Sequence, residues 1–233
     1  MLAVIIFLLL AVISLFIVNA INGIQEKERI RRQSQRKLTV HADSLINTVN
    51  ALEQMVPNKM IAKVINDEAI KILKEALALE KGPSPHTTHL ESSIQQAQLH
   101  SDVLAAANAS DIKANYQQET DAQITYAQSE LKEALNILRQ FSFENIITDD
   151  EFTIYETDLL WAILMVNVTS CIGQGQRMLA MGDRFVSKSL LQKAHNLLAE
   201  SSLPDPRRVA MIAEVDEIIE GKREAMSPHL LHQ

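Results

Sequence analysis

The chain contains few of the residues that interrupt helices, with six Gly and six Pro among 233 residues. It also lacks any segment in which polar and apolar residues alternate as they do along a half-buried strand. Between the Gly and Pro positions, apolar residues recur at intervals of three and four, which is the period of a helix face. The sequence therefore predicts an all-α fold, with a multi-helix bundle of antiparallel helix hairpins.

Cysteine is nearly absent, and tryptophan occurs once. Cys171 is the only cysteine, so an internal disulfide is excluded, which suits a reducing compartment but is tolerated elsewhere. It follows the unbroken apolar run from Leu159 to Val166, which is too short to cross a membrane. We expect this run, with Trp161, to be buried on all sides at the centre of the bundle, and Cys171 to be a small buried side chain.

Charged side chains are absent from residues 1–24, and Ser14 is the only polar side chain among the first 18. About 20 apolar residues suffice for a helix to cross a hydrocarbon core roughly 30 Å thick. These residues therefore predict a single transmembrane helix at 1–24. The alternative is a cleaved secretory signal. The small-residue spacing at residues 18–20 favours it, and the lack of Lys or Arg before the apolar run argues against it.

Six of the 22 basic residues lie in the segment 25–37 that follows. Basic residues flanking a span tend to remain in the cytoplasm, so we expect the N-terminus outside and the rest of the chain in the cytoplasm. The same residues can lie along anionic lipid head groups, at about 1 kcal/mol each. The simpler alternative is a solvated helix face that contacts only lipid. This basic block consists of Lys27, Arg29, Arg31, Arg32, Arg36 and Lys37.

The chain beyond the basic block is acidic. Residues 38–233 contain 16 basic and 27 acidic residues, a net charge of −11. Such a body repels phosphate backbones, so nucleic-acid binding is not expected. We expect residues 38–224 to form the α-helical domain and residues 225–233 a flexible C-terminal tail.

The first helix of this domain carries a heptad seam that ends at Pro57. The seam is shorter than three heptads, which is short for an independent coiled coil. It is therefore expected to pack on the domain or on a partner, such as a second copy of the chain. Its apolar residues step by four, three, four, three and four positions: Leu38, Ala42, Leu45, Val49, Leu52 and Val56.

The later helices are placed by the same periodicity and by capping residues. Thr148 and Glu151 form a capping-box pattern. Gly82 and Gly221 are expected to follow helix ends, and Asp183 and Asp205 to be N-caps. The helices are predicted at residues 59–81, about 90–107, about 111–141, from 148 onward, about 184–199 and about 206–220.

Two residue patterns resemble ligand sites without completing one. Gly173 and Gly175 lack the preceding strand and third glycine of a nucleotide fingerprint, so they more simply permit close helix approach. His86 and His89 make an incomplete metal-ligand set, and His100 lies about 16 Å farther along a helix. No metal or other cofactor is therefore expected.

The remaining histidines are His41 and His195, isolated in helical patterns, and His229 and His232 in the tail. No reactive constellation accompanies them, so the sequence predicts no enzyme.

Five residues between positions 175 and 208 fall near a known helix-pair spacing: Gly182, Phe185, Ala194, Leu198 and Pro206. Over about 34 residues this resembles the tetratricopeptide repeat, whose helix pairs dock other proteins. Met178 and Ser201 depart from the motif's preferred Trp and Ala, and no second copy follows at the same period. The resemblance implies helix-hairpin packing, and no family is assigned from it.

The leading hypothesis is a membrane-anchored, non-catalytic adaptor or scaffold that binds another protein at the cytoplasmic face. The alternative is a helical sensor that binds a small ligand between its helices on the non-cytoplasmic side. The two require opposite membrane topologies, so the orientation of the C-terminus distinguishes them.

Overall fold

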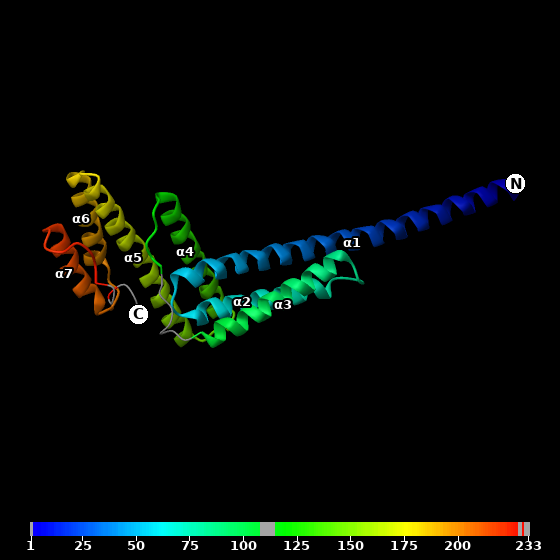
Figure 1. Ribbon diagram of the computed structural model, residues 1–233. Helices are drawn as coiled ribbons and strands as arrows, with labels where there is room; N and C mark the ends of the chain where they lie inside the picture. Colours follow the sequence, from blue (N-terminus) through cyan, green and yellow to red (C-terminus); the bar gives the residue numbers. More distant parts are fainter. Residues whose placement is uncertain (1, 108–114, 228–229, 231–233) are drawn as a thin grey trace. The chain divides into compact units, whose positions relative to one another are not determined.

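The structure is a computed structural model that describes residues 2–107, 115–227 and 230, with the side chains at 2–18, 20 and 24 outside the description. The described residues form α-helices and no strand, which confirms the all-α prediction (Figure 1). The helices are α1 (Leu2–Met55), α2 (Lys59–Ala78), α3 (Pro85–Ala106), α4 (Asp121–Phe143), α5 (Asp149–Ala180), α6 (Arg184–Glu200) and α7 (Arg207–Ile219).

The chain divides into two compact units, and α1, α2 and α3 each contribute residues to both. The first unit comprises residues 1–43 and 68–97, and the second comprises residues 44–67 and 98–233. The first contains 9 basic and 7 acidic residues, a net charge of +2, and the second contains 13 basic and 22 acidic residues, a net charge of −9. The two units therefore favour ligands of opposite sign.

Within the described residues, no helix combines the length and the apolar character that crossing a membrane requires. The predicted span at residues 1–24 falls mainly on side chains that lie outside the description. The span therefore stays a prediction.

The first unit packs one face of α1 against the antiparallel helices α2 and α3 (Figure 1). The expectation that Gly82 follows the end of the second helix is wrong, because α2 ends four residues earlier, at Ala78. The N–H groups of Leu79 and Glu80 bond to the carbonyls of Ala76 and Leu77, three residues back, so a tight final turn closes the helix without a glycine. The buried core of the first unit includes Ala42, Ala69, Ile72, Leu73, Ala76, Leu90 and Ile94.

The second unit is organised around α5, which contacts α4 and α6, while α7 contacts α6. The predicted capping box at its start is confirmed: the Glu151 N–H donates to the Thr148 hydroxyl, and the Thr148 N–H donates to the Glu151 carboxylate at 2.8 Å. Burial on nearly all sides is also confirmed, and Trp161 is 5% exposed. The fully buried side chains of α5 include Leu159, Met165, Val166 and Val168.

The predicted long helix at 111–141 begins later than expected. Residues 108–114 lie outside the description, and α4 starts at Asp121. Thr120 caps it, in a second capping box with Gln123 that the apolar periodicity did not indicate. Tyr116 consequently precedes the helix, where it is 4% exposed.

The ends of the last helices follow their capping residues closely. Asp183 accepts the Val186 N–H as the N-cap of α6, as predicted. Gly182 adopts φ +86° and separates α5 from α6, whereas the tetratricopeptide repeat keeps this glycine inside a helix. Gly221, with φ +75°, follows α7 as predicted. The N-cap of α7 is Pro206 and not Asp205, although the Asp205 carboxylate still accepts the Arg207 N–H at 2.8 Å.

The segment expected to be a flexible tail is partly packed. The Ser227 N–H donates to the Glu214 carboxylate at 2.7 Å, and Met226 and Leu230 are buried. Residues 228, 229 and 231–233 of this segment lie outside the description. The described part of the tail therefore belongs to the second unit.

A polar cluster borders the buried surface of α5. The Arg207 guanidinium lies 4.4 Å from the centre of the Trp161 ring and pairs with Asp205 at 2.6 Å. Asn58 donates to Asp158 at 2.7 Å. Burial raises the pKa of Asp158, and it raises the pKa of Tyr116 from 10.0 to about 12. Nearby Asp158 and Asp205 add to the rise at Tyr116, and Arg207 opposes it.

This raised pKa predicts a loss of stability at high pH. Between pH 10 and about 12 the unfolded chain loses the Tyr116 proton and the folded chain retains it. Unfolding is therefore favoured as pH rises through this window, by roughly 2–3 kcal/mol in total. In urea unfolding across this pH range, the free energy of unfolding should fall less steeply with pH for Tyr116→Phe than for the wild-type chain. Tyr126→Phe, at an exposed tyrosine, should decline like wild type, and identical slopes for all three would contradict the assignment.

The prediction that the paired glycines of α5 permit close helix approach is confirmed for Gly175 and not for Gly173. A Cβ at Gly175 would lie 3.2 Å from Cγ of the buried Leu191 and 3.3 Å from the carbonyl oxygen of Ser187, both on α6. A Cβ at Gly173 would meet the end of the exposed Gln117 side chain, which can rotate away. Only Gly175 is therefore required for close approach to another helix.

Alanine substitutions separate these two environments. Both gain the same helix propensity, about 1 kcal/mol, so their difference reports the packing cost. We expect Gly175→Ala to be less stable than Gly173→Ala by roughly 1–3 kcal/mol in urea unfolding. Equal stabilities would show that α6 accommodates a methyl group at Gly175.

Candidate anion-binding cavity

The first unit contains a cavity of about 460 Å³ on the basic part of α1. Residues 31, 35 and 39 are spaced by four along the helix, as are residues 32, 36 and 40, so two adjacent stripes of α1 form one wall. Residues from beyond α2 and from the start of α3 complete the lining. The lining residues are Arg31, Arg32, Gln35, Arg36, Thr39, Val40, Glu80 and His86.

Gln35 connects the two sides of this cavity. Its buried amide donates to a Glu80 carboxylate oxygen at 2.7 Å and to the Ala76 carbonyl at 3.3 Å. His86 Nδ1 lies 2.9 Å from the same Glu80 oxygen. The hydrogen bond from Gln35, followed by that from His86, lowers the pKa of Glu80, so this carboxylate is ionised at neutral pH.

Arg31 is the cavity cation that has buried donors without an acceptor among the described residues. Its side chain is 20% exposed, and its Nη2 lies 3.6 Å from Glu28. Its Nε and Nη1 are buried and have no hydrogen-bond acceptor among the described residues. Leaving such donors without an acceptor costs about 1–3 kcal/mol or more.

The charge of the lining favours an anion. Three guanidinium groups face one carboxylate, that of Glu80. A guanidinium offers several N–H donors in a planar fork that matches the oxygens of a phosphate or carboxylate. The cavity is therefore suited to a phosphate-like anion held by the guanidinium groups of Arg31, Arg32 and Arg36.

The cavity contains only part of the predicted basic block. It brings together Arg31, Arg32 and Arg36, and it leaves Lys27, Arg29 and Lys37 exposed outside it. Sequence reasoning missed Gln35 and Glu80, and it considered His86 only as part of an incomplete metal-ligand set. Their role depends on contacts between residues 45 and 51 positions apart, for which the sequence carries no local signal.

The heptad seam on α1 is mostly buried within the chain. Ala42 is buried in the first unit, and Leu45, Val49, Leu52 and Val56 are buried in the second, while Leu38 is half-buried. In this structure the five buried residues pack internally and are not exposed to a partner.

Among the described residues, the histidines and the cysteine do not assemble into a further site. His100 pairs with Glu53 at 2.9 Å and His195 with Asp216 at 2.8 Å, while His41 and His89 are exposed. His229 and His232 lie outside the described residues. Burial raises the pKa of the Cys171 thiol, which suits a packed side chain. No group of three or more His, Cys, Asp or Glu side chains in the described ranges could hold a metal ion.

Comparison with known proteins gives no relative from which a site could be transferred. No family model matches the chain, and neither the curated proteins nor the solved structures provide a match.

Pyrophosphate provides a direct test of the cavity. In the full chain in uncharged detergent, titration should shift the NMR signal of the Arg31 Nε–H, and Arg31→Gln should weaken binding about tenfold or more. Arg29→Gln is the matched control, because Arg29 is 76% exposed and pairs only with Glu26 among the ion pairs of the described chain. Equal weakening by both substitutions would show diffuse charge attraction and no cavity site.

Proposed function

We propose that this chain is a single-pass membrane protein whose helical body acts as a non-catalytic adaptor or scaffold at the cytoplasmic face. Residues 1–24 form the span in this proposal, and the basic block with its arginine cavity contacts anionic lipid head groups. The acidic second unit then carries the surface that recruits another protein.

The observation that supports this proposal is the continuity of α1 from Leu2 to Met55. A single helix rises about 1.5 Å per residue, so Lys27 would lie roughly 5 Å beyond residue 24 and Arg31 roughly 10 Å beyond it. The polar head-group layer of a leaflet is about 5–8 Å thick. A continuous helix would thus carry the start of the basic block through this layer, within reach of lipid phosphates, and its end at Lys37 to roughly 20 Å beyond residue 24.

Anchoring supplies the mechanism of such an adaptor. A protein held at the bilayer meets membrane-bound or membrane-attracted partners at a raised effective concentration, without any additional contact energy. The helical body then needs only a modest affinity for its partner.

A topology measurement tests the proposal. With a C-terminal fusion to green fluorescent protein or to an alkaline phosphatase that requires export, we expect fluorescence and no phosphatase activity. Replacing all six basic residues of the block with Gln should produce a mixed orientation, since the charge asymmetry sets the topology. Replacing six Lys or Arg residues of the second unit with Gln is the matched control and should leave the orientation unchanged.

Phosphatase activity from the wild-type fusion would overturn the cytoplasmic adaptor and favour the sensor alternative. A fusion protein recovered entirely in the soluble fraction would overturn the anchor itself.

A further inference from the structure

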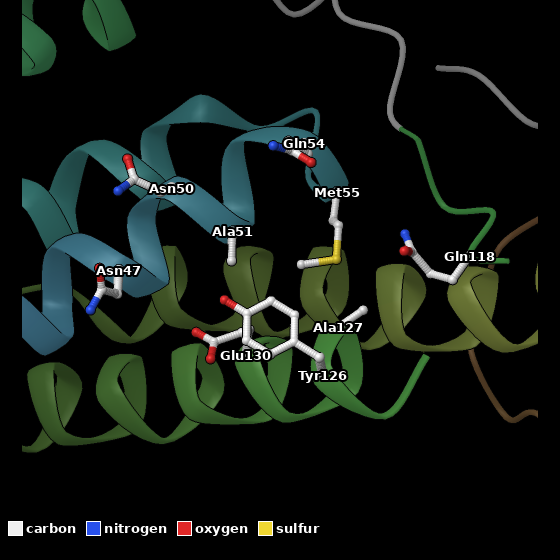
Figure 2. A pocket seen from close by; sticks show the side chains of 9 residues that line it. All are labelled: Asn47, Asn50, Ala51, Gln54, Met55, Gln118, Tyr126, Ala127 and Glu130. Carbon is white, nitrogen blue, oxygen red and sulfur yellow. The ribbon is translucent and has the colours of Figure 1, made fainter. Parts of the chain in front are cut away.

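The second unit contains a polar groove of about 470 Å³ between the C-terminal part of α1 and the start of α4. Figure 2 shows Tyr126 and Glu130 projecting from α4 on the side that faces α1, with Met55 extending toward Ala127 below it. All the lining residues belong to the second unit. The polar and aromatic residues of the lining are Asn47, Asn50, Gln54, Gln118, Tyr126 and Glu130.

Four side-chain amides line the groove, and none of them hydrogen-bonds to another residue in the described part of the chain. Three of them, at positions 47, 50 and 54, lie on one face of α1. Along the helix axis, residues 47 and 50 are about 4.5 Å apart and residues 50 and 54 about 6 Å apart. An extended polypeptide presents backbone groups toward one side about every 6.6–6.8 Å. Because a side-chain amide has both a donor and an acceptor, it can pair with the N–H and C=O of such a chain.

Tyr126 and Glu130 provide a binding position for a cationic side chain, called here the cation seat. They stand four residues apart on α4, so they are neighbours on one helix face. Tyr126 is 58% exposed, which leaves its ring available to the aliphatic stem or the charge of a Lys or Arg. Glu130 accepts the Thr48 hydroxyl at 3.3 Å, and within the described ranges no ion pair joins it to a cation. Its carboxylate has further acceptor sites.

The charge of the whole unit favours the same ligand. A net charge of −9 attracts cations before contact and raises their local concentration. A neutral sugar could also pair with amides and stack on a tyrosine, but it would gain nothing from this charge or from the unpaired carboxylate. An acidic segment would be repelled.

We infer that this amide groove binds an extended segment of a partner polypeptide, with one Lys or Arg of that segment seated between Tyr126 and Glu130. The amides of α1 and Gln118 pair with the partner's backbone, and the seat on α4 selects the basic residue. The inference names a partner class for the proposed adaptor and in that sense rests on it, but it is tested without reference to membrane orientation.

The probe is a display library of random nonapeptides, selected on the full chain in nanodiscs of uncharged phosphatidylcholine. We expect enrichment of Lys or Arg at one fixed position. A synthetic peptide of the enriched sequence should bind with an affinity measurable by fluorescence anisotropy. The combined change Asn50→Ala and Gln54→Ala should weaken its binding about tenfold, since side-chain pairing to the partner backbone is lost.

Glu130→Gln separates the cation seat from the amides. It should remove most of the preference for Lys over Gln at the enriched position, while a peptide carrying Gln there should bind about as before. Asn136→Ala, which removes an exposed amide from α4 outside the groove, is the matched control and should bind like wild type. Circular dichroism should show the same helix content in every variant.

Failure to enrich any peptide, or unchanged affinity in the groove variants, would overturn the inference. Binding of neutral oligosaccharides that depends on Asn50 and Gln54, without peptide binding, would assign the groove to carbohydrate and overturn it as well. The assay uses purified chain in a neutral bilayer. A reversed topology in cells would therefore contradict the cytoplasmic role without changing the measured peptide binding.

Discussion

The second unit depends on the burial of α5 from nearly all sides. A helix that is apolar around its circumference has no face to present to water, so other elements must cover it, and α4 and α6 do so directly. Each fully buried Leu, Val or Met side chain in it contributes about 1.5–3 kcal/mol of transfer free energy. Gly175 lets α6 approach closely enough to complete this cover. Buried residues of α4 and α6 cover α5, while the groove residue Tyr126 is exposed on α4.

Charge at the border of this core fixes how the last helix docks. Arg207 covers the Trp161 ring and is held there by Asp205, so a cation reaches an otherwise apolar surface without being left unpaired. Such a partly buried pair adds little net stability, because removing both charges from water offsets much of their attraction. The pair does restrict the position of the guanidinium, because this group must contact the ring and the carboxylate at the same time. We infer that this pairing contributes specificity to the docking of α7 more than it contributes free energy.

Features set by neighbouring residues could be predicted, and features set by distant contacts could not. The capping box at Thr148, the N-cap at Asp183 and the glycine stop at Gly221 were predicted correctly because each depends on a few adjacent residues. The predicted end of α2 and the predicted start of α4 were wrong. A tight final turn ends α2 and the Thr120 capping box begins α4, and apolar periodicity indicates neither. At the cavity the arginines were visible in the sequence. Their companions Glu80 and His86 were not, since only the packing of α2 and α3 brings them to α1.

The two proposed binding surfaces make opposite demands on charge, and a single chain that holds both has a physical consequence. An anionic membrane also attracts a basic polypeptide, so lipid competes with the amide groove for the same segment. Attraction to the membrane is spread over many head groups and falls off within about 8 Å at physiological salt. Hydrogen bonding of side-chain amides to a backbone does not weaken with salt in this way. The membrane would therefore concentrate basic partners near the anchor, and the groove would select among them by backbone pairing, which lipid head groups cannot supply in a fixed register.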